Sequence, residues 1–186
     1  NLTKRYKTNF MPLVLFFGLI VTSHAFDKSK SNRSDKAPAY HESVPKATFS
    51  NIPYGKHQRH ILDFWQAPSD TPTPLVFVMH GGGWKNGSKE RLSRFVDTSA
   101  LLKNGISVVA INYRLIKNNT NTKPPVKDPL DDAARALQFV RSKAKEWNIN
   151  KNRIAAAGAS AGACSSLWLT FHDDLADPEN ADPIAR

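Results

Sequence analysis

The chain has 186 residues, of which 40% are hydrophobic, so a mainly disordered protein is excluded and one globular domain is expected. A single cysteine excludes an internal disulfide framework and a cysteine-rich metal site. The formal net charge is +10, and residues 1–46, with 8 Lys or Arg against 3 Asp or Glu, carry +5 of it. Because the remainder is only mildly basic and has no basic run with interleaved aromatics, we expect no nucleic-acid partner.

The first 25 residues have the pattern of an export signal. A basic stretch at residues 4–7 precedes a twelve-residue apolar run at 10–21, and Ser23-His24-Ala25 supplies the small residues that signal peptidases recognise. The run is shorter than the roughly 20 residues that span a bilayer, although a short uncleaved anchor is the alternative. We therefore predict a signal peptide over 1–25, a secreted or periplasmic protein and no stable membrane anchor.

Polar residues follow the apolar run, and the globular pattern begins near residue 47. Residues 26–46 are rich in Lys, Ser, Asp, Pro and Ala, which predicts a flexible linker. Residues 47–49 and 60–65 are then predicted as two short strands. Residues 74–79 (Pro-Leu-Val-Phe-Val-Met) are almost continuously apolar, which is typical of a strand buried on both faces in a parallel sheet.

Amphipathic helices alternate with further apolar strands in the rest of the chain. Strands are predicted over 106–113 and 153–158, and helices over 89–103 with Ser88 as cap, from the cap Asp128 to about Trp147, and over 161–171. This alternation predicts an α/β fold with a mostly parallel sheet.

The segment Gly158-Ala159-Ser160-Ala161-Gly162 has the spacing G-x-S-x-G between a predicted strand and a predicted helix. In that context Ser160 is a candidate catalytic nucleophile on a sharp turn. Gly158 and Gly162 leave room for the strained backbone, and the helix N-terminus offers N–H groups to a developing anion. The alternative is a structural turn of small residues.

A second motif, His80-Gly81-Gly82-Gly83-Trp84, directly follows the predicted strand 74–79. Three consecutive glycines cost backbone entropy, and a close approach of their N–H groups to a substrate oxygen would account for them. A phosphate-binding loop and a flexible turn are the alternatives, although the Gly-Lys-Ser/Thr of the former is absent. Both motifs lie at the carboxyl ends of predicted strands, where open α/β sheets bind ligands.

These two motifs, together with Asn112-Tyr113-Arg114-Leu115 and residues 131–141, resemble the α/β-hydrolase esterases. The resemblance covers about residues 47–171 and is closest to the hormone-sensitive-lipase-like esterases and the feruloyl- and acetyl-xylan-esterase-like enzymes. It implies an α/β-hydrolase fold, with helices on both faces of the sheet. It also implies ester hydrolysis through an acyl-enzyme, without a cofactor or metal, on a small ester or an acylated carbohydrate.

The resemblance further implies a role for each residue of the two motifs. Ser160 corresponds to the nucleophile. The backbone N–H groups of Gly82, Gly83 and Ala161 correspond to the oxyanion hole. The loop is supported by His80, Gly81 and Trp84, and the turn by Gly158 and Gly162.

The chain departs from the family's pattern after the nucleophile. The triad of this family runs Ser, then Asp or Glu, then His, but only 26 residues follow Ser160. Their one histidine, His172, lies near the end of the predicted helix, roughly 15 Å or more from the turn at 1.5 Å per residue. We therefore expect residues 47–186 to be the N-terminal half of a hydrolase domain, truncated after the nucleophile, inactive alone, with the acid and histidine beyond residue 186.

Other polar residues have weaker claims to a function. Cys164 is predicted as a small buried residue, and His57 and His60 as surface residues. His172, Asp173 and Asp174 could suggest a metal site, but three adjacent residues rarely converge on one ion, so none is predicted. Two further classes stay open: a non-catalytic binding protein on the same scaffold and a prolyl-oligopeptidase-like serine peptidase.

Overall fold

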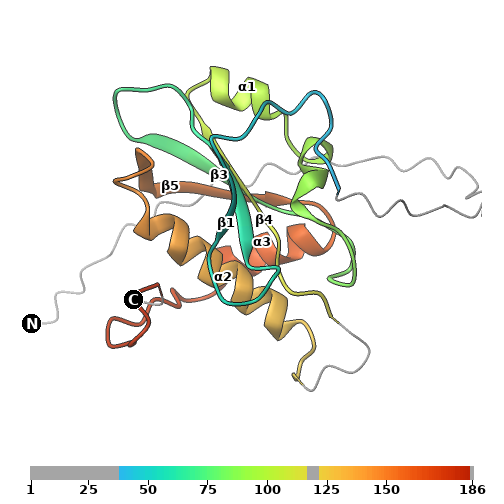
Figure 1. The fold of residues 1–186 in the computed structure, drawn as a ribbon. Helices are drawn as coiled ribbons and strands as arrows, with labels where there is room; N and C mark the ends of the chain where they lie inside the picture. The colour runs from blue at the N-terminus through green and yellow to red at the C-terminus, as the bar shows by residue number, and fades with distance from the viewer. Residues whose placement is uncertain (1–37, 117–121, 185–186) are drawn as a thin grey trace, which may run out of the picture. The chain divides into compact units, whose positions relative to one another are not determined.

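The computed structural model describes residues 38–116 and 122–184 (Figure 1). The predicted signal peptide, residues 1–25, lies outside the described residues. Within them the strands are β1 (Phe49–Pro53), β2 (Ile61–Trp65), β3 (Thr73–Met79), β4 (Ser107–Ile111) and β5 (Ile149–Gly158). The helices are the 3-10 helix η1 (Lys89–Arg94) and the α-helices α1 (Thr98–Lys103), α2 (Lys127–Ser142) and α3 (Ala161–Phe171).

The five strands form one sheet in the order β1-β2-β4-β3-β5. β3 pairs in parallel with β4 on one side and with β5 on the other, whereas β2 is antiparallel to both β1 and β4. Since parallel strands end at the same edge of a sheet, the segments that follow β3, β4 and β5 leave from one edge. The predicted α/β fold is confirmed, and both sequence motifs lie at this edge.

The core has two layers because alternate strand residues point to opposite faces of the sheet. On one face, Phe77 and Met79 of β3 join Val109 and Ile111 of β4 in a cluster that α2 and α3 cover. On the other face, Val78, Val108 and Ala110 pack with η1 and α1. Figure 1 shows α2 crossing in front of the sheet. Helices therefore lie on both faces, as the resemblance implied.

The predicted helix over 89–103 is wrong, because the segment is broken at residues 95–97 into η1 and α1. Ser88 makes no side-chain cap, whereas the Asp97 side chain accepts a hydrogen bond from the N–H of Ala100 at 3.0 Å and starts a new helix. Lys89, at the start of η1, is buried and pairs with Asp63 of β2 at 2.7 Å. This long-range ion pair sets the path of η1, and helical periodicity alone does not reveal it.

The bounds of the next two elements also differ from the prediction. α2 begins at Lys127 after Val126, so Asp128 lies in its first turn rather than at the cap, and the helix ends at Ser142 instead of near Trp147. β5 begins at Ile149, and among the described residues it pairs with β3 alone. Its alanine-rich end is therefore not buried on both faces, and Ala155 is exposed.

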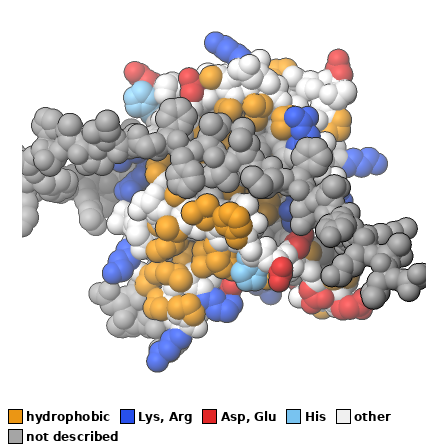
Figure 2. Space-filling view, turned by 180° about the vertical axis from the view of Figure 1, so that it is seen from behind, with side chains coloured by type: hydrophobic (Ala, Val, Ile, Leu, Met, Phe, Trp, Pro, Cys, Tyr) orange, Lys and Arg blue, Asp and Glu red, His pale blue; other side chains and the backbone are white. Residues whose placement is uncertain are grey.

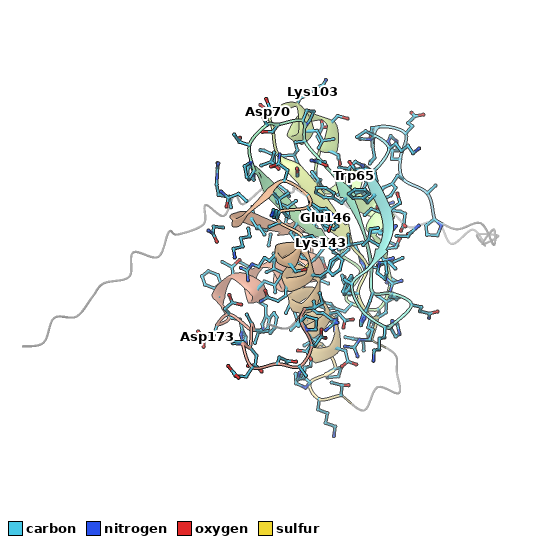
Figure 3. The ribbon with its side chains drawn as sticks, turned by 60° about the vertical axis from the view of Figure 1, so that its left-hand side comes forward. Trp65, Asp70, Lys103, Lys143, Glu146 and Asp173 are labelled. Carbon is cyan, nitrogen blue, oxygen red and sulfur yellow. The ribbon has the colours of Figure 1, made fainter. Side chains whose placement is uncertain are left out.

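Residues 38–46, the last part of the predicted linker, pack on the sheet. The Tyr40 ring meets the Trp65 ring edge-on, with 5.2 Å between centroids, and the Tyr40 hydroxyl donates to Asp63 Oδ2 at 2.7 Å. Trp65, labelled in Figure 3, donates from Nε1 to the carbonyl oxygen of Pro45 at 2.7 Å. A flexible linker is therefore the wrong description of 38–46, and the rest of that segment lies outside the described residues.

The described surface carries exposed apolar side chains, and Figure 2 shows hydrophobic groups gathered on the face seen from behind. The large exposed hydrophobic residues are Phe49, Leu167, Phe171 and Leu175. Among the helices of the described ranges, none has the length and apolar character needed to cross a bilayer.

Candidate active site

Ser160 lies on a strained turn between β5 and α3. Its backbone has φ 52° and ψ −120°, a left-handed conformation that a residue with a side chain rarely adopts. α3 begins at the next residue, Ala161, and the Ser160 side chain is exposed. The turn therefore presents a hydroxyl to solvent at the positive end of a helix, as the G-x-S-x-G spacing predicts.

The two glycines of this turn are required by close backbone packing. A Cβ atom on Gly158 would lie 2.4 Å from the carbonyl oxygen of Met79, and a Cβ on Gly162 would lie 2.1 Å from the same atom. Any side chain at either position would push the turn away from the end of β3. The absence of these side chains thus brings the serine turn against the start of the glycine loop.

The glycine loop itself approaches Ser160 closely. A Cβ on Gly81 would lie 2.7 Å from the carbonyl oxygen of Ala159 and 3.6 Å from Ser160 Cβ. Gly82 has φ +120°, and its Cβ would lie 2.1 Å from the carbonyl oxygen of Asn86. Gly83 has φ +59° with open space around it. Gly81 and Gly82 are therefore required by contacts, and Gly83 by its backbone angle.

The two segments that meet at Ser160 carry the backbone N–H groups that the resemblance assigns to the oxyanion hole. Within the described ranges, no hydrogen bond is donated by the backbone N–H groups of Gly82, Gly83 or Ala161. The N–H of Ala161 is one of the orphan donors of the first turn of α3. Among the described residues, these three N–H groups therefore have no intramolecular acceptor.

His80 is buried under the loop, with 2% of its surface exposed. Its Nδ1 lies 2.8 Å from the carbonyl oxygen of Gly81, and its ring stacks on Tyr113 at 4.2 Å between centroids. The Tyr113 hydroxyl donates to the carbonyl oxygen of His80 at 2.5 Å. Burial lowers the pKa of His80 to about 4, so the ring is neutral at pH 7. These contacts join the ring to the backbone of the loop and to Tyr113, which suits the supporting role that the resemblance implied.

Trp84 joins the loop to α3. Its Nε1 donates to Ser165 Oγ at 3.1 Å, and its carbonyl oxygen accepts from the N–H of Ile116 at 2.7 Å. Ser165 in turn donates to the carbonyl oxygen of Ala161 at 3.0 Å. The glycine loop, the segment after β4 and the first turn of α3 are therefore connected by hydrogen bonds.

Arg59, just before β2, is a site residue that the sequence analysis missed. Its Nε donates to the carbonyl oxygen of Tyr113 at 2.6 Å, and its Nη2 donates to that of Gly87 at 2.9 Å and lies 3.3 Å from His80 Nε2. No motif surrounds Arg59, and more than fifty residues separate it from Tyr113. Only the fold brings it to the loop.

A second buried polar group corrects the prediction for His60. This histidine is buried rather than on the surface, and its Nε2 lies 2.9 Å from Asp132 Oδ1 of α2. Asp132 also accepts from the Arg114 guanidinium, with Nη2 to Oδ1 at 2.6 Å. Despite the cost of burial, bonds from His60 and Arg114 hold the pKa of Asp132 below its usual value. This group joins α2 to the strand ends beside the site, whereas His57 is exposed as expected.

The remaining candidates lie away from Ser160 or differ from their predictions. Cys164 is exposed, because it lies on the outer side of α3, so the prediction of a buried residue is wrong. His172 ends α3 and rests against the Trp168 ring at 4.6 Å between centroids. Asp173, at the outside of the molecule in Figure 3, is exposed, and Asp174 pairs with Arg141 at 3.3 Å. Eleven helical residues, roughly 16 Å of axis, separate His172 from the serine turn.

The strained serine turn, the glycine loop and the mixed sheet together define an α/β-hydrolase fold. The model of the BD-FAE family matches residues 62–181, which is more than half of the chain. The chain therefore belongs to the BD-FAE family, among the α/β-hydrolase esterases.

Named relatives agree with this family. The probable carboxylic ester hydrolase LipM of Mycobacterium tuberculosis is 36% identical over 140 residues, which cover 71% of this chain and 31% of LipM. The carboxylesterase NlhH of the same species is 32% identical over 62% of this chain and 34% of its own length. The acetyl ester-xyloside bifunctional hydrolase from Caldicellulosiruptor lactoaceticus has a similar structure, with a TM-score of 0.59 and 29% identity over 78% of this chain and 54% of that one. The chain thus spans about a third of the length of these curated relatives and about half of that solved structure.

Proposed function

We propose that this chain carries the nucleophile and the oxyanion hole of a serine carboxylic-ester hydrolase. The observation that carries the proposal is the φ of 52° at Ser160, on a turn that faces the glycine loop. A strained serine exposed at a helix N-terminus suits nucleophilic attack. The esterase relatives support the same chemistry.

In the proposed reaction, Ser160 Oγ bonds to the carbonyl carbon of an ester while its proton passes to a general base. The N–H groups of Gly82, Gly83 and Ala161 stabilise the negative charge on the carbonyl oxygen. The C–O bond to the alcohol then breaks as the base returns the proton to the leaving oxygen. Water attacks the acyl-enzyme by the same steps in reverse and releases the acid.

The proposal takes the general base from beyond residue 186. Among the described histidines, His80 faces the carbonyl oxygen of Gly81, and His172 lies at the far end of α3. A base must come within about 2.6–3.2 Å of the nucleophile. We therefore propose that the triad histidine and its Asp or Glu follow this sequence in the whole protein, and that residues 1–186 alone do not turn over ester.

The proposed substrate is a small ester or an acylated carbohydrate. The Caldicellulosiruptor protein supports this class, because it is an acetyl ester-xyloside bifunctional hydrolase. No cofactor takes part in the proposed steps, since the serine, the base and the backbone donors account for the bonds made and broken.

The test compares the protein expressed from its complete reading frame with its Ser160→Ala variant. We expect hydrolysis of p-nitrophenyl acetate to fall by at least about 10⁴-fold in kcat, as for other serine nucleophiles. A fluorophosphonate probe should label Ser160, found by peptide mass. Cys164→Ala, an exposed thiol one turn along α3, is the matched control and should keep the wild-type rate. Retained turnover by Ser160→Ala, or turnover of peptides alone, would overturn the proposal.

We also propose that residues 1–25 are a signal peptide and that the protein is secreted or periplasmic. The basic start, the apolar run and the Ser-His-Ala segment support this. The mature protein should begin at or near Phe26 in the extracytoplasmic fraction. N-terminal sequencing that finds residues 10–21 in mature soluble protein would contradict it.

A further inference from the structure

Arg59 contacts the buried ring of His80 with a group that can only donate hydrogen bonds. Its Nη2 lies 3.3 Å from His80 Nε2, and its other bonds go to the carbonyl oxygens of Tyr113 and Gly87. A guanidinium has five N–H donors and no acceptor. His80 Nε2 can therefore face Arg59 only as an unprotonated acceptor.

The proton of the neutral ring is then on Nδ1. Nδ1 lies 2.8 Å from the carbonyl oxygen of Gly81 and donates to it. The Tyr113 hydroxyl is 3.1 Å from the same nitrogen but donates to the carbonyl oxygen of His80 at 2.5 Å, so it does not compete for the acceptor. The opposite tautomer would set two donors, Nε2–H and the guanidinium, against each other and leave Nδ1 facing a carbonyl oxygen.

Burial is the main cause of the low pKa of the ring, and Arg59 before β2 and Arg91 of η1 lower it further. The hydrogen bond to the carbonyl oxygen of Gly81 and the charge of Glu90 of η1 act in the opposite direction, but they do not outweigh burial. Tyr113, after β4, stays uncharged because burial raises its pKa. His80 is therefore one neutral tautomer over the range in which esterases are assayed.

The orientation of the Gly81–Gly82 peptide follows from this tautomer. In a trans peptide the C=O and the next N–H point in opposite directions. With the Gly81 oxygen held toward the His80 ring, the N–H of Gly82 points away from the ring. A Cβ on Gly81 would lie 3.6 Å from Ser160 Cβ, so the Gly81–Gly82 peptide begins beside the nucleophile.

We propose that Arg59 is a positioning residue, which selects the Nδ1–H tautomer of His80 and thereby orients the N–H of Gly82 as an oxyanion donor. The inference rests on the proposed function, because the oxyanion is that of ester hydrolysis. Arg59 touches neither substrate nor Ser160, and it acts through the ring of His80.

The first arm of the test reads the tautomer directly and needs no activity. In the protein from the complete reading frame, labelled with ¹⁵N-histidine, the His80 signals are assigned by their loss in His80→Gln. At pH 7 we expect the proton on Nδ1, and in Arg59→Met a mixture of both tautomers. A wild-type ring with its proton on Nε2 overturns the proposal, even if Arg59→Met fails to fold.

The second arm measures steady-state kinetics with p-nitrophenyl acetate. Arg59→Met should lower kcat about 10- to 100-fold, the effect of a misplaced group or donor, with KM nearly unchanged. Arg59→Lys keeps the charge but cannot reach all three acceptors, so it should recover only part of the loss. Arg94→Met, at the exposed end of η1, is the matched control and should keep the wild-type kcat.

The outcomes separate this inference from the proposed function. If Ser160→Ala keeps the wild-type rate, the proposed function fails. The NMR measurement of the His80 tautomer still tests whether Arg59 selects it. If Ser160 is labelled and wild-type turnover is normal, but folded Arg59→Met has an unchanged kcat, the positioning role alone is overturned.

Discussion

The glycine loop after β3 and the serine turn after β5 leave neighbouring parallel strands at the same edge of the sheet, yet they are held differently. The loop depends on polar side chains from distant segments: Arg59, Tyr113 and Ser165. The serine turn depends on the absence of side chains at Gly158 and Gly162. Without a Cβ, the backbone of these two residues can pack directly against the carbonyl oxygen of Met79. The loop is therefore maintained by hydrogen bonds in addition to its own close contacts at Gly81 and Gly82, whereas the turn is maintained by steric fit.

This difference has consequences for how each region fails. Steric fit does not depend on pH, and it tolerates no added atom, since a Cβ on Gly162 would lie 2.1 Å from the carbonyl oxygen of Met79. A hydrogen-bonded loop can lose one partner and keep part of its order, and it responds to protonation. Substitutions in the two regions should therefore differ in size and in pH dependence.

The largest effect is expected for Gly162→Ala in the protein from the complete reading frame. The new Cβ would lie 2.1 Å from the carbonyl oxygen of Met79 and must displace backbone. We expect destabilisation of about 3 kcal/mol or more, the upper range of overpacking, and loss of p-nitrophenyl acetate turnover. Thermal unfolding and kinetics measure both. Gly105→Ala is the control, because it meets no atom within 4 Å and adds only left-handed strain of about 1–2 kcal/mol. Wild-type turnover in Gly162→Ala would contradict the steric account.

A smaller effect is expected for Gly82→Pro in the loop. Proline removes the N–H that the proposal assigns to the oxyanion, and losing one such donor costs about 10²–10³ in kcat. The positive φ of Gly82 adds distortion, since proline requires a negative φ. Gly83→Ala, which keeps its N–H and has open space, should lose less. Unchanged turnover by folded Gly82→Pro would remove Gly82 from the oxyanion hole.

The third effect leaves turnover aside and is a pH dependence of stability that the loop should show and the serine turn should not. The pKa of His80 is about 4 in the folded protein and about 6.5 when unfolded, so between these values the unfolded chain binds more protons. Stability from this ring is complete above pH 6.5 and falls as the pH drops toward 4, by roughly 3 kcal/mol in total. His80→Gln lacks this component, so its urea midpoint should approach that of the wild type as the pH falls from 7 to 4.5. A constant difference between the two proteins would contradict the assignment.

Predictions from the sequence held where the signal was local. The buried strands and the serine turn were predicted because apolar runs and glycine spacing reflect the backbone within a few residues. The helix over 89–103 was wrong because the segment breaks at residues 95–97, where Asp97 starts a new helix, and helical periodicity alone did not show this break. The prediction of a flexible linker was wrong for residues 38–46, because the Tyr40 ring packs against the Trp65 ring. The residues next to Tyr40 in the sequence do not reveal this contact.

The sequence by itself determined the order of strands and helices, the position of Ser160 between a strand and a helix, and the glycines that this turn and the loop require. Each of these depends on backbone conformation and on the side chains of adjacent residues, so a short stretch carries the information. The contact of Arg59 with His80, the burial of His60 against Asp132 and the exposure of Cys164 were decided only by the tertiary structure. The first two features join residues tens of positions apart, and the third depends on which side of α3 faces the sheet. The free energy of these contacts is gained only when the sheet and its helices have packed.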